Sequence, residues 1–584
     1  MQRVTLPLHL PLIVLFGLSL LGGCAQMSEV DMVDSLKQDT VLTPKEGIIT
    51  ARVIDASRKG LPFNYMTITP KNVNESDTAK PQRLSAVPEE TGGTVMFAAA
   101  VPSGEYAFSN LRAYYVKGEA WYSRWASEDI DLGTFQVKPG EVTDLGTLVY
   151  YPRVQEDKYQ DAVLRVPGSE ALPIAREFVA FEALETESPL GWNNDQMNAE
   201  RRSLYASAVQ NPTAFNDYLH APDGSLYFYG KLGSVLVRSP DGQWSMDAVE
   251  ADADMHSMDM NRQGDMVIGG NLGNLYYKET DGAWQHLPLE KALSVQEVNF
   301  HTDDQIDVIA KSHRDIVVTR FTREAGAHSS EELARYNART GWVSHKGESN
   351  PVGVSQRRST KTDRIGYVYT QTIDDEHLLF MSTQSGHNNN VLSDHDSMVF
   401  SLEPKTWELS IPTSHTDMDK ILDAGAVNIG LKEPGFFSLS GDPTYYRYKS
   451  SSQEWEKLKT EFDQCPSLDR SARSCKKNGQ RVRRFLDFDL MSVPVFSSTT
   501  DALAIARYQP RRQSEDAQIF IVATDNGGEH WTRTGNEPPK PYCTSTVPEL
   551  TETFLLYCNG ASSDVYQSED GGETWKRVRE HRNF

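Results

Sequence analysis

The chain has 584 residues, with 58 lysines and arginines against 81 aspartates and glutamates, so its formal net charge is −23 at pH 7. So long a chain exceeds what one hydrophobic core can hold, and two or more domains are expected. Its acidity argues against nucleic acid and anionic lipid as partners, because both carry the same sign of charge.

The first 23 residues predict an export signal. Arg3 precedes an apolar run over residues 6–21, which is too short for a spanning helix, and small residues lead up to Cys24. The stretch Leu21-Gly22-Gly23-Cys24 resembles the lipobox of bacterial lipoproteins. That resemblance implies that Cys24 is acylated and anchors the chain to a membrane. Because Ala25 follows it, the resemblance implies an outer-membrane lipoprotein that faces the periplasm or the cell surface. An ordinary secretory signal cut nearby is the alternative.

The next stretch predicts a tether and then a small domain. Residues 24–46 are acidic and hold few large apolar side chains, which indicates a flexible tether. Over residues 47–153, short alternating runs separated by glycine and proline are typical of an antiparallel β-sandwich. Parts of this region, 101–106 and 137–142, resemble carboxypeptidase-regulatory-like, transthyretin-like sandwiches. Trp121 and Trp125 are expected to pack in the core or at an edge, with an exposed ligand-binding patch as the alternative.

Residues 154–213 predict a partly helical connector. Between Asp195 and Gln210, Met197, Arg201, Leu204 and Ala208 follow one another at steps of four, three and four. That spacing predicts one amphipathic helix, which we expect to pack under the following domain.

Residues 214–584 predict a β-propeller. The segment Gly230–Trp244 is echoed at a period of 40 by Gly270–Trp284, and fixed-period similarity marks a repeat fold. The same order of strand, polar turn and tryptophan returns at Trp342, Trp407, Trp455, Trp531 and Trp575. Seven such tryptophans predict seven blades, with six or eight as alternatives. A closed disc is expected, because an open arc would expose two apolar faces. The chain is therefore all-β: a sandwich, a short helical connector and a propeller.

Two turns near the C-terminus carry a longer motif. The stretch Ser568-Glu569-Asp570-Gly571-Gly572-Glu573-Thr574-Trp575 and the stretch Thr524–Trp531 resemble BNR or Asp-box repeats, whose pattern is Ser-x-Asp-x-Gly-x-Thr-Trp. The first matches at Ser568, Asp570, Gly572, Thr574 and Trp575; the second matches with conservative changes at Thr524, Asn526, Gly528 and Trp531 and departs at His530. In that family these residues lie in outer turns, so the resemblance implies a structural role for them.

Four cysteines besides Cys24 predict two disulfides in an exported protein. Three pairings are formally open, and the short separations favour Cys465 with Cys475 and Cys543 with Cys558. A zinc site is the rival, but no Cys-x-x-Cys spacing supports it.

Three clusters of charged residues are candidate ligand sites. The segment 387–396 and the trio Asp252, Asp254 and His256 contain metal-binding residue types, but their spacing matches no known site, so polar loops are favoured and no metal or other cofactor is expected. Seven cations crowd residues 470–484, which makes Arg481, Arg483 and Arg484 candidates to bind an acidic partner. A solvated loop is the alternative.

The Asp-box resemblance leaves catalysis open. Sialidases use three arginines, one in a Phe/Tyr-Arg-Ile-Pro stretch that this chain lacks, and Arg201 and Arg202 lie on the predicted helix. Xyloglucanase-like propellers use two carboxylates, which cannot be chosen among 81. The Gly-x-Leu-Gly and Asp-Gly-Trp repeat also resembles propellers that help assemble photosystem II, which implies binding. The sequence therefore favours a lipid-anchored envelope scaffold that presents loops to a protein or glycan partner, and the alternative is an extracellular glycoside hydrolase of the sialidase or xyloglucanase type.

Overall fold

The computed structural model describes most of the chain between residues 30 and 580. The described ranges are 30–57, 61, 63–71, 80–88, 94–117, 120–127, 132–155, 158–193, 199–324, 326–337, 341–344, 349–350, 364–385, 394–410, 418–432, 444–464, 473–477, 479–508, 517–534, 536–541, 543–547, 553–558 and 563–580. The predicted signal and Cys24 lie outside them. Over these ranges, no helix is long and apolar enough to cross a membrane.

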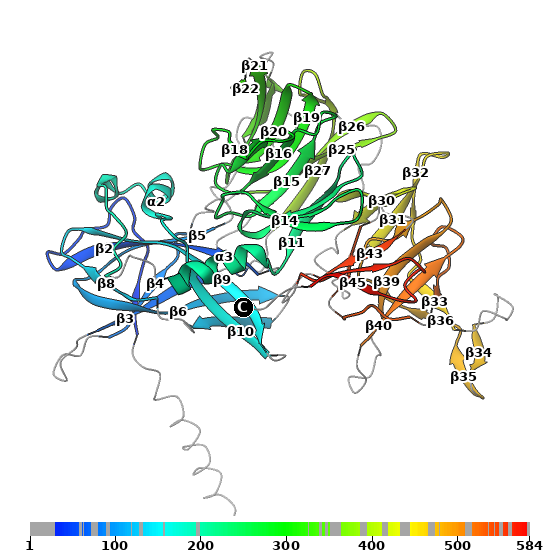
Figure 1. Cartoon of the computed structure of the whole chain (residues 1–584), viewed down its shortest axis with the longest axis horizontal. Helices are drawn as coiled ribbons and strands as arrows, with labels where there is room; N and C mark the ends of the chain where they lie inside the picture. Colours follow the sequence, from blue (N-terminus) through cyan, green and yellow to red (C-terminus); the bar gives the residue numbers. More distant parts are fainter. Residues whose placement is uncertain are drawn as a thin grey trace, which may run out of the picture.

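Two sheets packed face to face form the N-terminal part (Figure 1). Sheet A has the order β1 (Asp31–Val33), β4 (Gln82–Ser85), β3 (Phe63–Pro70), β6 (Gly104–Lys117) and β7 (Ala120–Ser127), with β8 (Thr134–Val137) on β6. Sheet B has the order β10 (Lys158–Arg165), β9 (Val142–Gln155), β2 (Glu46–Asp55) and β5 (Val95–Pro102). One core joins them, in which Met66 and Leu111 of sheet A meet Ile49 and Phe97 of sheet B.

This two-sheet part takes in more of the chain than the alternating pattern indicated. Strand β1 pairs with β4, and Leu36 is buried, so part of the expected tether belongs to the packed structure. Strand β10 extends sheet B into the expected connector. The connector then contains α2 (Leu172–Phe178), η2 (Glu182–Glu185) and α3 (Ala199–Gln210), the last at the place of the predicted helix.

Seven sheets of four or more strands, together with two two-stranded sheets, follow in the described part of residues 215–579. The first three are β11 (Phe215–His220), β12 (Leu226–Gly230), β13 (Ser234–Arg238) and β14 (Trp244–Ala248); β15 (Met255–Met260), β16 (Met266–Gly270), β17 (Leu275–Lys278) and β18 (Gln285–His286); and β19 (Ser294–Thr302), β20 (Gln305–Lys311), β21 (Asp315–Glu324), β22 (Ala327–Asn337), β23 (Gly341–Ser344) and β24 (Ser349–Asn350). The next two are β25 (Arg364–Ile373), β26 (Glu376–Ser385), β27 (Asp394–Glu403) and β28 (Glu408–Ser410); and β29 (Lys420–Asp423), β30 (Asn428–Lys432), β31 (Thr444–Lys449) and β32 (Glu454–Lys457). The last two are β37 (Asp489–Leu490), β39 (Ala502–Tyr508), β40 (Gln518–Thr524) and β41 (Thr532–Arg533), with β38 (Val495–Phe496) on β39; and β42 (Ser545–Thr546), β43 (Phe554–Tyr557), β44 (Val565–Ser568) and β45 (Lys576–Arg579).

Shared apolar clusters join these sheets into a closed ring. Each consecutive pair of sheets contributes to a common cluster, from the first pair to the pair formed by the sixth and seventh. A further cluster joins the seventh sheet back to the first, where the rings of Phe228 and Tyr557 lie 5.0 Å apart. This closure confirms the predicted all-β fold with a propeller of seven blades, numbered one to seven in chain order.

The two parts meet at the first two blades. Arg52 of β2 is buried and forms an ion pair of 3.0 Å with Asp252, which precedes β15. The hydroxyl of Tyr151 in β9 donates to the backbone oxygen of Asn211, next to α3. At the other end of the ring, Arg579 of β45 donates to the backbone oxygen of Gln210 at the end of α3, so the last strand of the ring lies beside this helix. The connector is thus held by both parts.

Candidate binding site

The first strand of each blade lies at one edge of its sheet. In blades one to four these first strands contact one another, which places them around the axis of the ring. Each is the edge of its sheet, and an edge strand leaves backbone N–H groups without a ladder partner. Side chains from the preceding blade accept some of them: Asp259 accepts from the amide of Phe300 at 2.7 Å, and Tyr369 accepts from the amide of Ile421 at 3.2 Å.

Glu297 makes the same kind of connection between blades three and four. Its carboxylate accepts hydrogen bonds from the amide and the hydroxyl of Thr370 and from the side-chain amide of Asn299. Burial raises the pKa of Glu297 and also that of Asp259. Because hydrogen bonds hold both carboxylates between blades, they are poorly placed to act as a glycosidase acid and base.

Asp217 of β11 stands apart from these carboxylates. Within the described ranges, its carboxylate accepts one hydrogen bond, from the amide of the adjacent Tyr218 at 2.9 Å. Its side chain is exposed to solvent, but the blades that surround it raise its pKa, and the positive charge of Lys420 on blade five opposes that shift. Asp217 is therefore an acidic group that a single hydrogen bond holds among the described residues.

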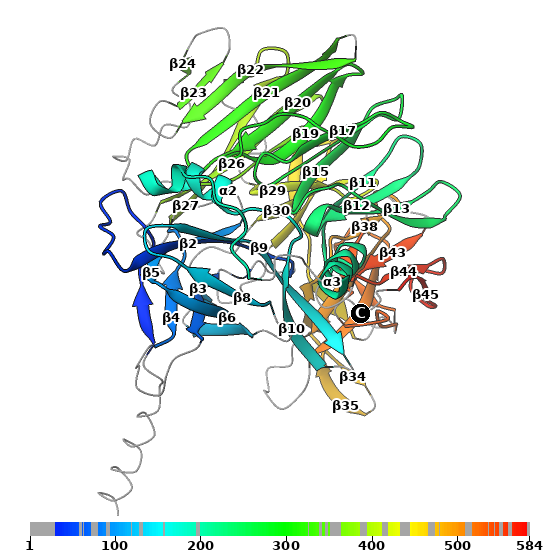
Figure 2. The same ribbon diagram turned by 60° about the vertical axis from the view of Figure 1, so that its left-hand side comes forward.

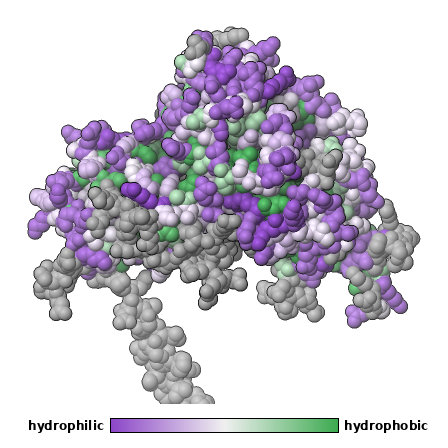
Figure 3. Space-filling view, in the orientation of Figure 1, coloured by the Kyte–Doolittle hydropathy of each residue, from purple (hydrophilic) through white to green (hydrophobic). Residues whose placement is uncertain are grey.

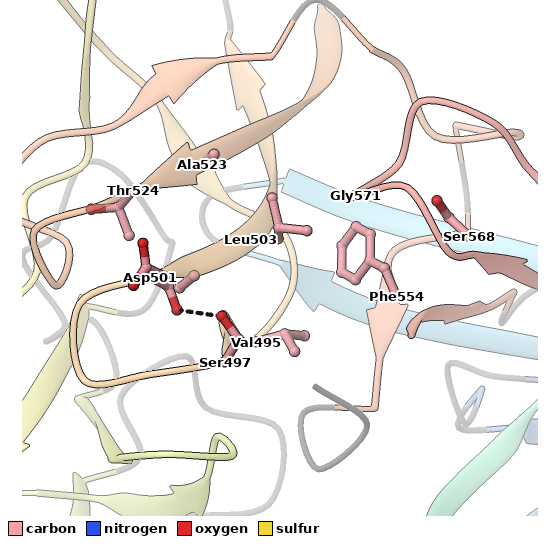
Figure 4. Close-up of a pocket in the computed structure, with 10 residues that line it drawn as sticks. Val495, Ser497, Asp501, Leu503, Ala523, Thr524, Phe554, Ser568 and Gly571 are labelled. Carbon is pink, nitrogen blue, oxygen red and sulfur yellow. Dashed lines mark hydrogen bonds between the residues drawn. The ribbon is translucent and has the colours of Figure 1, made fainter. Parts of the chain in front are cut away.

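Two adjoining cavities lie on the side of blades six and seven. The first has a volume of about 260 Å³ and is lined by residues including Val495, Leu503, Phe554, Thr524 and Ser568. Figure 4 shows Leu503 and Phe554 in its middle, with Thr524 and Ser568 toward its two ends. The backbone oxygen of Asp501 accepts a hydrogen bond of 3.3 Å from the hydroxyl of Ser497, drawn as a dashed line there. The opening is thus apolar in its centre and polar at its ends.

The second cavity is larger and more acidic. Its volume is about 340 Å³, and it shares Asp501, Ala523 and Thr524 with the first. Its lining adds Asp463, Asp525, Asn526, His530 and Phe485. The rings of Phe485 and His530 stack with centroids 6.1 Å apart. Sequence reasoning missed this lining, because strand pairing brings together segments that are distant in the chain.

The Asp-box turns form the rim of these cavities. In the last blade, the Ser568 hydroxyl accepts from the amide of Gly572 at 2.8 Å, and Asp570 accepts from the amide and the hydroxyl of Thr574. These bonds, first that from the Thr574 hydroxyl, lower the pKa of Asp570 to about 2. The side chains named by the motif are occupied inside the turn, so they are unavailable to a ligand.

The turn of blade six has the same geometry with one bond fewer. The Thr524 hydroxyl accepts from the amide of Gly528 at 3.0 Å, and the Asn526 side-chain oxygen accepts from the amide of His530 at 3.0 Å. His530 replaces the hydroxyl donor, so only its backbone bonds to Asn526. The indole of Trp531 is fully buried between blades five and six, whereas that of Trp575 is half-buried.

A basic hairpin stands next to the second cavity. Strands β34 (Ser474–Lys477) and β35 (Gln480–Arg483) pair with each other, and the chain then enters β36 (Phe485–Asp487), which pairs with β33 (Glu461–Asp463). Figures 1 and 2 both show β34 and β35 projecting from the molecule. Arg481 and Arg483 are exposed there, and Arg481 donates to the Ser474 hydroxyl at 2.9 Å. The base of the hairpin thus adjoins the cavity through Phe485.

Arg484 differs from the sequence-based expectation for this group. Its side chain is fully buried and pairs with Asp463 at 2.9 Å. It therefore neutralises one carboxylate of the cavity wall and presents no charge to a partner. Cys475 of β34 is buried and disulfide-bonded, while its predicted partner Cys465 lies outside the described residues.

The remaining predicted site residues have these outcomes. Cys543 and Cys558 form the predicted disulfide. The part of the chain that is described contains no group of three histidine, cysteine, aspartate or glutamate residues placed to hold a metal. Asp254 pairs with Lys231 and His256 bonds to Asn271, so the trio expected as a polar loop belongs to the junction of blades one and two. Residues 387–393 lie outside the described ranges, and Asp394–Glu403 is a strand.

Neither a protein-family model nor a curated protein sequence matches this chain. Among solved structures, it is similar to YCF48 bound to D1 peptide (10% identity, TM-score 0.32, 60% of this chain and 92% of that one). It is also similar to BamB from Moraxella catarrhalis (14%, TM-score 0.27, 63% and 95%) and to an auxiliary nutrient binding protein from Bacteroides ovatus (10%, TM-score 0.26, 92% and 98%). The fold assignment rests on the seven sheets and their shared clusters, since likeness at such scores adds nothing to it.

Proposed function

We propose that this protein is a lipid-anchored binding protein of the cell envelope, whose propeller receives a protein partner at blade six. The observation that carries the proposal is the exposed basic hairpin β34–β35 beside an acidic cavity of about 340 Å³. The partner segment that fits carries acidic residues for the hairpin and a cationic side chain for the cavity.

The charge of the hairpin supports an acidic partner. Arg473, Lys476, Arg481 and Arg483 are exposed, and none of them forms an ion pair within the described ranges. Like charges at this density repel one another unless an anion relieves them. Hydrophilic residues cover most of the face shown in Figure 3, which fits a surface that meets its partner through charge.

The cavity supports a partner with a second, opposite charge. Asp501 accepts from the hydroxyls of Ser498 and Thr500, and these two bonds lower its pKa, so it is ionised at neutral pH. Asp463 is neutralised by Arg484, whereas no hydrogen bond to the Asp525 side chain occurs among the described residues. The cavity therefore keeps a net negative charge next to the basic hairpin. A partner segment with acidic residues followed by a cationic residue would complement both surfaces.

The test is a charge reversal at the exposed positions only. Proteins crosslinked to the wild-type chain in envelope extracts are identified first, and binding is then measured for Arg481→Glu with Arg483→Glu. We expect the complex to be lost while the melting temperature is unchanged, because exposed charges contribute little to stability. Wild-type binding should also weaken as salt rises. Arg262→Glu, an exposed arginine on blade two, is the matched control. Capture of the same proteins in the same amounts by the double variant would refute the proposed site.

The anchor rests on the lipobox resemblance and needs its own test. Metabolic labelling with a palmitate analogue should tag the wild-type protein, and Cys24→Ser should abolish the label and release the protein from membranes. Labelling that persists in Cys24→Ser would refute the anchor without affecting the partner site.

A further inference from the structure

The outer face of sheet A is the most unusual surface outside the propeller. The outer face of sheet B is covered, since α2 and α3 pack on it. Sheet A points away from the propeller in Figures 1 and 2, and no described element packs on its outer face. Trp125 of β7 is 58% exposed there, although sequence reasoning favoured packing in the core or at an edge. Alternation in the sequence distinguishes the two faces of a strand, but which face is buried depends on the sheet that packs against it.

Two arginines on this face lack carboxylate partners. Arg83 of β4 and Arg112 of β6 lie on either side of β3, and within the described ranges neither forms an ion pair. Burial, followed by the charge of Arg112, lowers the pKa of Arg83. Five other buried or half-buried arginines pair with carboxylates, namely Arg52, Arg320, Arg323, Arg447 and Arg484, whereas Arg165 bonds to a backbone oxygen. Because two adjacent cations without a counter-charge are unfavourable, the face is suited to an external anion.

Aromatic rings frame the arginines. The guanidinium of Arg112 lies 3.9 Å from the centre of the Trp125 ring and donates to the hydroxyl of Tyr114 at 2.7 Å. Tyr65 packs edge-on against Tyr114, with centroids 5.8 Å apart. Stacking on the Trp125 ring holds the Arg112 guanidinium in a fixed plane, and the opposite face of the ring is open to solvent. The ring therefore offers a flat apolar surface next to a positively charged guanidinium.

Unpaired polar atoms lie along the same face. The side-chain nitrogen Nε of Arg112, whose residue is 7% exposed, has no hydrogen-bond partner, and neither has Nε of Arg83. The Thr67 hydroxyl and the Asn110 side-chain oxygen are also unpaired, and these residues are register neighbours on β3 and β6. These four atoms lie beneath the surface of the face, so a ligand would contact the exposed parts of Trp125 and of the arginines and not these atoms.

We propose that the outer face of sheet A binds a short carboxylated oligosaccharide. A sugar ring would stack on Trp125, and its carboxylate would accept hydrogen bonds from Arg83 and Arg112. A planar carboxylate matches the fork of a guanidinium, which makes such pairs both strong and specific. The net charge of the whole chain does not prevent this, because screening limits exposed charges to about 8 Å at physiological ionic strength. The proposal is independent of the partner site on blade six.

The test measures binding of a hexameric oligogalacturonate to the full chain by calorimetry. Arg83→Gln and Trp125→Ala should each weaken binding about ten- to a hundredfold, since each removes a contact to a charged or stacked group. Trp125→Phe should retain part of the affinity, and Arg262→Gln should bind as the wild type does. Unchanged melting temperatures show that the variants are folded, and both target side chains are at least partly exposed.

Three comparison ligands decide whether the occupant is a glycan. A neutral hexasaccharide should bind at least tenfold more weakly, which supports the role of the carboxylate. Equal binding of a hexaglutamate peptide would overturn the proposal in favour of an acidic protein. Binding of phosphatidylglycerol vesicles but not of oligogalacturonate would overturn it in favour of a membrane surface. Absence of oligogalacturonate binding at millimolar concentration, or binding that both variants leave unchanged, would also overturn it.

Discussion

Replacing Trp531 and Trp575 by alanine, one at a time, tests whether burial of the ring or membership of the Asp-box motif determines the loss of stability. Both residues end an Asp-box turn, so the motif alone predicts equal losses of stability. Their surroundings differ: the Trp531 ring is fully buried between blades five and six and meets Phe488 edge-on at 6.4 Å. The Trp575 ring is half-buried between blades six and seven, 5.7 Å from Phe554.

The expected losses follow from these surroundings. Truncating a fully buried tryptophan costs about 3–5 kcal/mol, because apolar contact is lost and a cavity remains. Trp575 loses roughly half as much apolar burial, so about 2 kcal/mol is expected. Trp125→Ala, at a ring that is 58% exposed, should lower the free energy of unfolding by about 0.5–1 kcal/mol, because its contact with Arg112 is lost.

Urea unfolding followed by far-UV circular dichroism measures all three variants, since removal of a tryptophan would disturb fluorescence. Losses are compared as shifts of the midpoint at an unchanged slope. Equal losses at Trp531 and Trp575, or a larger loss at Trp575, would refute the argument that burial at the blade interface sets the cost. A large loss at Trp125 would refute the assignment of its ring to the surface.

Three further predictions concern charged groups. Because the surrounding blades raise the pKa of Asp217, its ionised form is disfavoured in the folded state, so Asp217→Asn should raise the melting temperature at pH 7, with the gain disappearing below about pH 3.8; the gain should be small, since the side chain is exposed to solvent. Arg52→Ala should cost about 3–5 kcal/mol in chemical unfolding because it leaves the Asp252 carboxylate unpaired, and Asp252→Ala in addition should cost less than the sum of the single losses. The pKa of Asp570 is depressed to about 2, so its contribution is present above about pH 3.8 and lost as the pH falls toward 2; Asp570→Ala should flatten the pH dependence of the melting temperature in that window.

The repeat was predictable because it is encoded by residues close together in the chain. Leu232 and Leu272, 40 residues apart, both have φ of 57°, and the glycines that follow have φ of 69° and 67°. A side chain at Gly233 would approach the backbone oxygen of Val249 to 2.5 Å, and one at Gly273 that of Glu290 to 2.7 Å. Local sequence therefore fixes the turn, and its recurrence reveals the blade.

Contacts between distant segments were not predictable in the same way. Arg484 belongs to a run of cations, and nothing local indicates that Asp463, 21 residues earlier, accepts its guanidinium in a buried pair. Likewise, the acidic segment around Asp31 looks solvated, yet it pairs in parallel with Gln82 at the edge of sheet A. In both cases the contact depends on how the strands pair in the sheet, and a run of acidic or basic residues does not indicate which residue will be the partner.

The contacts between the two parts have a consequence for both proposed surfaces. The outer face of sheet A and the hairpin of blade six lie on different parts of the molecule, which the Arg52–Asp252 pair and the contacts of α3 join. A glycan bound to sheet A would hold the hairpin of blade six close to the layer that contains the glycan. A protein partner anchored in that layer would then bind the hairpin at a raised effective concentration. This gain depends on the junction. Arg52→Ala should therefore weaken capture of the blade-six partner on glycan-coated beads while leaving its capture in solution unchanged. Equal effects of the substitution in both settings would show that the junction does not couple the two surfaces.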